Sequence, residues 1–145
     1  QLLDELLAGV GLDRSKVFIT NVVRHRPPEN RDPLPDEVAA CDIWLRRHVD
    51  ILKPKVIVTL GRHAMYKFFP AESISRIHGK VRKTADGVVV FPMYHPAAAL
   101  HQPALRSALV ADMAALALYL ETEAPAARPA AAQEKPVDQM TLFRD

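Results

Sequence analysis

The sequence is poor in cysteine, in net charge and in long apolar runs, and each shortage excludes a class of protein. Its single cysteine, Cys41, cannot form an internal disulfide and suits a reducing compartment. No apolar run approaches the ~20 residues of a membrane span, so we expect no membrane association. The amphipathic start lacks the basic region of a signal peptide, and we therefore expect a cytoplasmic protein.

Charge and histidine spacing do not indicate a site by themselves. Lys and Arg number 19 against 17 Asp and Glu, and the net charge of +2 is too small to indicate nucleic-acid binding without local clusters. The histidines form no H-x-x-x-H or H-x-H pair of the kind that binds metals. A metal-dependent hydrolase stays an alternative that a measurement of bound metal would test, with candidate ligands His25, His63, His78 and His95.

What the sequence does contain is the balance of one soluble globular domain: 145 residues, 49% apolar and 25% charged. Apolar residues at helical spacing predict four helices, the second capped by Asp36, over residues 2–10, 36–53, 62–69 and 104–121. Apolar, β-branched runs predict strands over 16–23 and 55–61, and two extended segments around an Asp86-Gly87 turn within 73–96. This order predicts an α/β fold, a three-layer α/β/α sandwich with a mostly parallel central sheet.

Three of the predicted strands end in residues that could meet at one place. Asn21 follows the first strand, Gly61 the second, and His95 the third. In open α/β sheets, ligands bind in the crevice beyond the carboxyl ends of the strands. We therefore expect Asn21 and His95 to converge on one small ligand, although an Asn at this point could also simply end its strand with an Asx turn.

Four stretches, in this order, resemble family 4 uracil-DNA glycosylases: "FITNVVRHRPPENRDPLPDEVAACDIWL", "LKPKVIVTLGRHA", "ISRIHGKV" and "VFPMYHPAAAL". The resemblance covers roughly residues 1–121. It implies an enzyme of DNA repair that hydrolyses the glycosidic bond of uracil in DNA and so begins base-excision repair. A uracil-DNA binding module without turnover, including relatives that capture the lesion covalently, is the alternative, and release of free uracil separates the two.

The resemblance also implies roles for individual residues. His95 would donate a hydrogen bond to uracil O2 as negative charge develops on the departing base, and Asn21 would read the edge of a base flipped out of the stack. Leu100 would fill the place of the flipped base, unless it is a buried helix residue. Basic residues that could grip the phosphates on both sides of the lesion are Arg24, Arg26, Arg31, Arg76, Lys80 and Arg82.

Two departures from the family pattern limit this interpretation. The family's Gly-rich "GEAPG"-type motif would precede Gln1, so we expect this chain to be the C-terminal two-thirds of the enzyme, without the water-activating residue, the ring that stacks on uracil and an edge of the sheet. The family usually holds a [4Fe-4S] cluster on four cysteines, two of them upstream. Cys41 matches one cysteine and His25 stands at another. Either His25 is an unusual ligand or this branch has lost the cluster, and we favour loss.

The end of the chain has a different composition. From residue 124 it is mostly Ala, Pro and Gln, which predicts a disordered tail over 124–145 after a domain over 1–123. The tail contains "QMTLF" at 139–143, which resembles the pentapeptide that docks bacterial repair proteins on the DNA-polymerase sliding clamp. Gln139, Leu142 and Phe143 would be its anchors. We therefore expect a bacterial, nucleoid-associated monomer with DNA and the clamp as partners.

Overall fold

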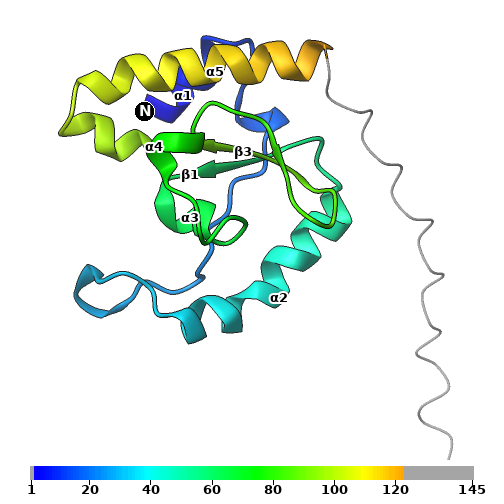
Figure 1. The fold of residues 1–145 in the computed structure, drawn as a ribbon, viewed down its shortest axis with the longest axis vertical. Coiled ribbons are helices and arrows are strands. Elements are labelled where there is room, and N and C mark those ends of the chain that lie inside the picture. Colours follow the sequence, from blue (N-terminus) through cyan, green and yellow to red (C-terminus); the bar gives the residue numbers. More distant parts are fainter. Residues whose placement is uncertain (1, 123–145) are drawn as a thin grey trace, which may run out of the picture.

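The computed structural model of the chain describes residues 2–122, which form a mixed α/β fold (Figure 1). Helix α1 (Leu2–Ala8) packs against the long helix α5 (Ala104–Thr122), and both lie on the same side of the strands (Figure 1). The buried residues of both helices join those of strand β3 in one apolar core of Leu6, Leu7, Phe91, Met93, Leu109, Met113 and Leu116. None of the described helices is long and apolar enough to cross a membrane.

The sheet has three strands in the order β1-β3-β2. Strand β1 (Ile57–Leu60) pairs in parallel with β3 (Val89–Met93), and the short β2 (Arg82–Lys83) pairs antiparallel with the other edge of β3. Every residue of β3 is buried, whereas β1 is mostly half-buried. The described sheet is therefore mixed, with one parallel and one antiparallel pairing, and not mostly parallel as the sequence predicts.

Helix α2 (Pro35–Leu52) has nearly the bounds that the sequence predicts, but its start is built differently. The Glu37 carboxylate accepts the backbone N–H of Leu34 at 2.8 Å, so it satisfies an amide that precedes the helix. The prediction that Asp36 caps this helix is wrong, because Asp36 lies inside the first turn.

The apolar face predicted for α2 is not packed, and none of the residues of this helix is buried. Trp44 is 48% exposed, and the guanidinium groups of Arg24 and Arg47 lie 5.7 Å and 5.6 Å from its ring centroid. Leu45 and Val49 are only half-buried. In Figure 1, α2 lies on the side of the molecule away from α1 and α5.

Three other predicted elements differ from the structure. Residues 17–21, predicted as a strand, are extended but pair with none of the three described strands, and Phe18 and Ile19 are about half exposed. The first extended segment predicted within 73–96 begins instead with the short helix α4 (Ile74–Ile77) before β2. The turn at Gly87 is confirmed, with a φ of +79°. Helix α3 (Arg62–Tyr66) is shorter than predicted.

Candidate active site

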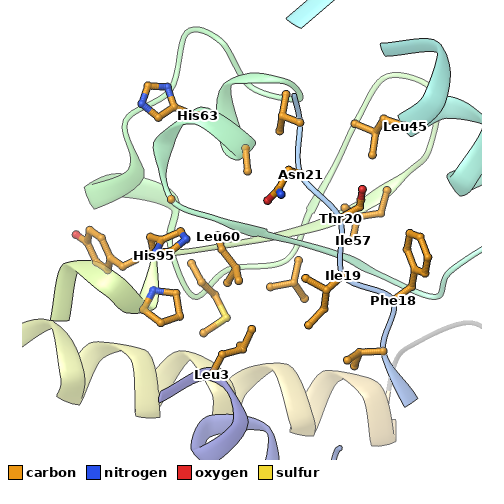
Figure 2. Close-up of a pocket in the computed structure, with 18 of the residues that line it drawn as sticks. Leu3, Phe18, Ile19, Thr20, Asn21, Leu45, Ile57, Leu60, His63 and His95 are labelled. Carbon is orange, nitrogen blue, oxygen red and sulfur yellow. The ribbon is translucent and has the colours of Figure 1, made fainter. Parts of the chain in front are cut away.

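A cavity of about 2010 Å³ has residues of all three predicted strand ends in its lining. Residues from the extended segment 17–21, from β1 and from helices α1, α2 and α5 line it. Asn21 and His95, both labelled in Figure 2, border this cavity, as do Gly61 and Leu100.

Gly61 brings the ends of β1 and β3 into contact. Its N–H donates to the carbonyl of Met93 at 2.8 Å, and its φ of +85° is a conformation that other residues rarely adopt. A Cβ at this position would lie only 3.1 Å from the Cβ of His95. The glycine therefore allows the histidine to sit directly against the end of the neighbouring strand.

His95 is held in one tautomer by its own turn. It precedes the 3-10 helix Pro96–Leu100, and its Nδ1 accepts the N–H of Ala97 at 3.1 Å. A ring nitrogen that accepts carries no proton, so the proton of the neutral ring is on Nε2. The side chain is exposed at the edge of the cavity (Figure 2), where Nε2–H is available as a donor.

Asn21 and Leu100 border the same cavity from different elements. Figure 2 shows the Asn21 amide turned into the cavity from the extended segment. Leu100 ends the 3-10 helix and is 73% exposed. The alternative that Leu100 is a buried helix residue is therefore wrong.

The predicted basic residues fall into two groups. Arg24 and Arg26 line the cavity, and the Nε–H of Arg26 donates to the side-chain oxygen of Asn30. The other four do not line it, and two of these are held by acidic partners. Arg82 donates to Glu72 at 3.0 Å, and Arg31 makes two hydrogen bonds with the Glu37 carboxylate, at 2.7 Å and 2.9 Å.

The pair of Arg31 and Glu37 has an electrostatic consequence. Its hydrogen bonds, together with the one from the Leu34 N–H, favour the charged carboxylate and lower the pKa of Glu37 from 4.5 to about 2. Arg31 thus holds the loop before α2 in place. Its charge is already paired with Glu37 and is less available to a phosphate. The remaining two basic residues, Arg76 and Lys80, lie at α4 and just after it, where the Lys80 ammonium donates to the Arg76 carbonyl at 3.1 Å.

The described residues do not fit an iron-sulfur cluster by themselves. Nowhere within residues 2–122 do three or more His, Cys, Asp or Glu side chains gather as metal ligands. Cys41 is half-buried, and its Sγ accepts the N–H of Arg24 at 3.4 Å, which places His25 one residue from this contact. A [4Fe-4S] cluster needs four ligands, usually thiolates. The described residues offer one thiol.

One polar group at the cavity was not predicted as part of the glycosylase site, although the sequence offered His63 as a candidate metal ligand. Arg62 and His63 open helix α3 directly after Gly61 and line the cavity. The Asp32 carboxylate accepts from Arg62 at 3.1 Å and lies 2.9 Å from Nε2 of His63. The sequence signal for Arg62 and His63 was their position immediately after a strand end. Their partner Asp32 lies thirty residues before Arg62 in a proline-rich loop, and no sequence pattern indicated its role.

A second polar pair lies behind His95. Nδ1 of His78 is 2.9 Å and 3.1 Å from the two carboxylate oxygens of Asp112, which is 6% exposed. The His78 ring packs on Tyr94, with centroids 4.5 Å apart. A Cβ at Gly79 would lie 2.2 Å from Asp112, so only glycine fits there. The sequence did contain a signal for this pair, because Asp112 is the one acidic residue on the core face of α5.

Comparisons with known proteins agree with the family resemblance. The sequence pattern of the uracil DNA glycosylase superfamily matches residues 1–117. A type-4 uracil-DNA glycosylase of Sulfurisphaera tokodaii is 48% identical over 120 residues, which are 77% of this chain and 53% of that protein. Those of Archaeoglobus fulgidus and Saccharolobus solfataricus are 45% and 43% identical, with 77% of this chain and 60% and 54% of the relative covered. The chain thus spans about half the length of these curated relatives.

Proposed function

The chain belongs to the uracil DNA glycosylase superfamily, and on that premise we propose that the complete protein is a uracil-DNA glycosylase of base-excision repair. The C1′–N1 bond breaks and its electron pair leaves with the uracil. A water oxygen bonds to C1′ of the sugar and the water gives up one proton, which balances the negative charge of the departing uracil. The observation that carries the proposal is the hydrogen bond from the Ala97 N–H to Nδ1 of His95. It fixes a donor on Nε2 at the mouth of the cavity.

His95 supplies the electrostatic part of the reaction. Its Nε2–H donates to uracil O2, and this bond strengthens as the departing base becomes negative. Because the ring is already held by its turn, no reorganisation is needed when the charge develops. The residue that activates water lies outside residues 2–122 in this proposal, and no described side chain is assigned that step.

Asn21 selects the base. Its amide donates to uracil O4 and accepts from N3–H, a pattern that cytosine inverts. Cytosine would leave buried polar groups without partners, which is a strong ground for rejection. Leu100, exposed on its 3-10 helix beside the cavity, enters the space that the flipped base leaves. Arg24 and Arg26 are the nearest of the predicted phosphate contacts, since both line the cavity.

The proposal extends to the whole protein. The complete protein acts as a bacterial, nucleoid-associated, cytoplasmic monomer. Its complete fold is a three-layer α/β/α sandwich with a mostly parallel sheet. Its tail residues Gln139, Leu142 and Phe143, which lie outside the described residues, bind the sliding clamp. Cys41 acts as an ordinary thiol, in keeping with the Arg24 N–H that its sulfur accepts. A cluster would need thiolates that residues 2–122 do not contain.

The test uses the complete protein and a short uracil-containing oligonucleotide. His95→Ala should lower the single-turnover rate of uracil release by ~100-fold or more, because one preorganised donor is lost. DNA binding should change little, since phosphate contacts dominate affinity. Wild-type protein that binds the oligonucleotide but releases no free uracil would instead support the binding module without turnover.

A further inference from the structure

The only tryptophan of the chain, Trp44, lies on the surface of α2 together with two arginines. The residue is 48% exposed, whereas tryptophan is on average a highly buried residue. The guanidinium carbon of Arg24 lies 5.7 Å from the centroid of the indole ring, and that of Arg47 lies 5.6 Å from it. Both distances are within the ~6 Å range of a cation–π interaction. We call Trp44, Arg24 and Arg47 the tryptophan patch.

The two arginines of the tryptophan patch keep their charge free of acidic partners. Arg46, on the same helix, is 75% exposed and forms an ion pair with Asp42. Within residues 2–122, neither Arg24 nor Arg47 forms such a pair with a carboxylate. Exposed guanidinium groups without a carboxylate partner attract anions. The patch therefore offers positive charge and an aromatic surface to the same ligand.

Arg24 connects the tryptophan patch to the cavity. Its N–H donates to Sγ of Cys41 at 3.4 Å, which holds this part of the chain against α2. Cys41 precedes Trp44 by three residues, so both lie on the same side of the helix. Arg24 and Asn21 both line the cavity, and three residues of chain span at most ~11 Å. A DNA strand whose uracil reaches Asn21 can therefore continue past Arg24 to Trp44.

Single-stranded DNA is the ligand that matches both parts of this chemistry. Its phosphates are anionic and pair with guanidinium groups, and its unpaired bases expose faces that stack on aromatic side chains. In a duplex, the bases stack on one another and present only their edges in the grooves. A surface indole then has no base face to contact, so a duplex uses only the charged part of the patch.

We propose that the tryptophan patch binds the single-stranded DNA that flanks the uracil, with one unpaired base stacked on Trp44 and nearby phosphates held by Arg24 and Arg47. This inference rests on the proposed function, because DNA is the ligand in both. Its consequence concerns the choice between DNA forms. Uracil in a single strand is held by a stacking contact that uracil within a duplex does not receive, so Trp44 favours single-stranded substrate.

The experiment uses the complete protein and DNA without uracil. The ligands are a single strand of ~12 nucleotides, the duplex of the same sequence, and heparin as a polyanion without bases. Fluorescence is recorded for the wild type and for Trp44→Leu, and the difference between them is the emission of Trp44. Affinities are measured at several salt concentrations for Trp44→Leu and Arg47→Gln. Arg46→Gln is the matched control, since it removes the same charge one residue away.

The single strand should quench the Trp44 emission, and heparin should bind without quenching it. Trp44→Leu should weaken single-strand binding about tenfold and change duplex binding less than twofold. Arg47→Gln should lower the slope of log affinity for the single strand against log salt concentration by ~0.7, and Arg46→Gln should leave this slope unchanged.

Three results would overturn the proposal. The first is a Trp44 emission that does not respond to the single strand, or that heparin quenches equally. The second is equal affinity of the wild type and Trp44→Leu for the single strand. The third is a Trp44 that acrylamide cannot quench in the DNA-free complete protein, because another part of the protein would then cover the patch. Uracil release by the wild type is measured separately, so failure of the proposed activity is distinguished from failure of this binding surface.

Discussion

At the level of single residues, the position of His95 depends on a neighbour that has no side chain. Gly61→Ala adds a methyl group 3.1 Å from the Cβ of His95 and also strains a φ of +85°. Because a small displacement of a reacting group can cost ~100-fold in rate, we expect uracil release by the complete protein to fall by a factor approaching that. Single-turnover kinetics measure the effect.

Gly87→Ala is the matched control for this prediction. Gly87 has a similar φ of +79°, but nothing lies within 4 Å of a Cβ placed there. Both substitutions introduce backbone strain of ~1–3 kcal/mol, and only the one at Gly61 should slow the reaction. Equal rates for the two variants would mean that Gly61 does not position the histidine.

The candidate site residues that the sequence suggests are those that follow predicted strands. Asn21 and His95 follow apolar runs directly, so their meeting at one cavity needed only the rule for the carboxyl ends of strands. The link between Asp32 and His63 could not be found in this way, because it depends on how a proline-rich loop folds back on α3. The tautomer of His95 depends on one backbone N–H, that of Ala97, whose direction no sequence pattern gives.

Between elements, the pair of His78 and Asp112 joins the end of α4 to α5. Asp112→Ala leaves His78 without its partner in a part-buried setting and should lower the free energy of unfolding by ~1–3 kcal/mol. Asp112→Asn keeps an acceptor for the ring and should cost less. Arg106→Ala, which breaks the exposed ion pair with Glu5, should cost at most ~1 kcal/mol. Denaturant unfolding of the three variants measures the loss in free energy of unfolding for each. Equal losses for Asp112→Ala and Arg106→Ala would contradict the prediction.

The start of α2 should be sensitive to acid through Glu37. Its pKa in the folded chain is about 2, below the ordinary 4.5, because Arg31 and the Leu34 N–H favour the carboxylate. A lowered pKa means that the stabilisation is complete above pH 4.5 and is lost as the pH falls towards 2. The difference in melting temperature between wild type and Glu37→Gln should therefore shrink over that range. A difference that does not change with pH would show that the ion pair contributes nothing, and added salt should reduce the effect.

The sequence predicted helices and strands whose formation depends on local pattern. Its predictions failed for segments whose structure depends on pairing with another segment. The bounds of α2 and α5 follow from helical spacing and nearby prolines, and β3 from a continuous apolar run. The same reasoning predicted a strand over 16–23, where the structure has no strand. It could not find that residues 17–21 are unpaired, because strand status is a property of two segments.

For the molecule as a whole, the tail and the catalytic domain should act separately. Replacing Leu142 and Phe143 together by Ala removes both apolar anchors of the proposed clamp motif, each worth ~2 kcal/mol or more in such contacts. Binding of the purified protein to a bacterial sliding clamp should fall to baseline. Uracil release from a short free oligonucleotide should not change. If wild type and double variant bind the clamp equally, the motif at 139–143 has no docking role.

The apolar walls of the cavity also have a calorimetric consequence. Folded proteins usually gain ~12–15 cal/mol/K of heat capacity per residue on unfolding, because buried apolar surface becomes hydrated. In this chain the apolar walls of α2, β1 and residues 17–21 are already partly in contact with solvent. Unfolding therefore hydrates less new surface, and we expect a heat-capacity increment per residue below that range, with a correspondingly low denaturant slope. A calorimetric increment within or above that range would contradict this expectation and would mean that these apolar residues are already shielded from solvent in the folded chain.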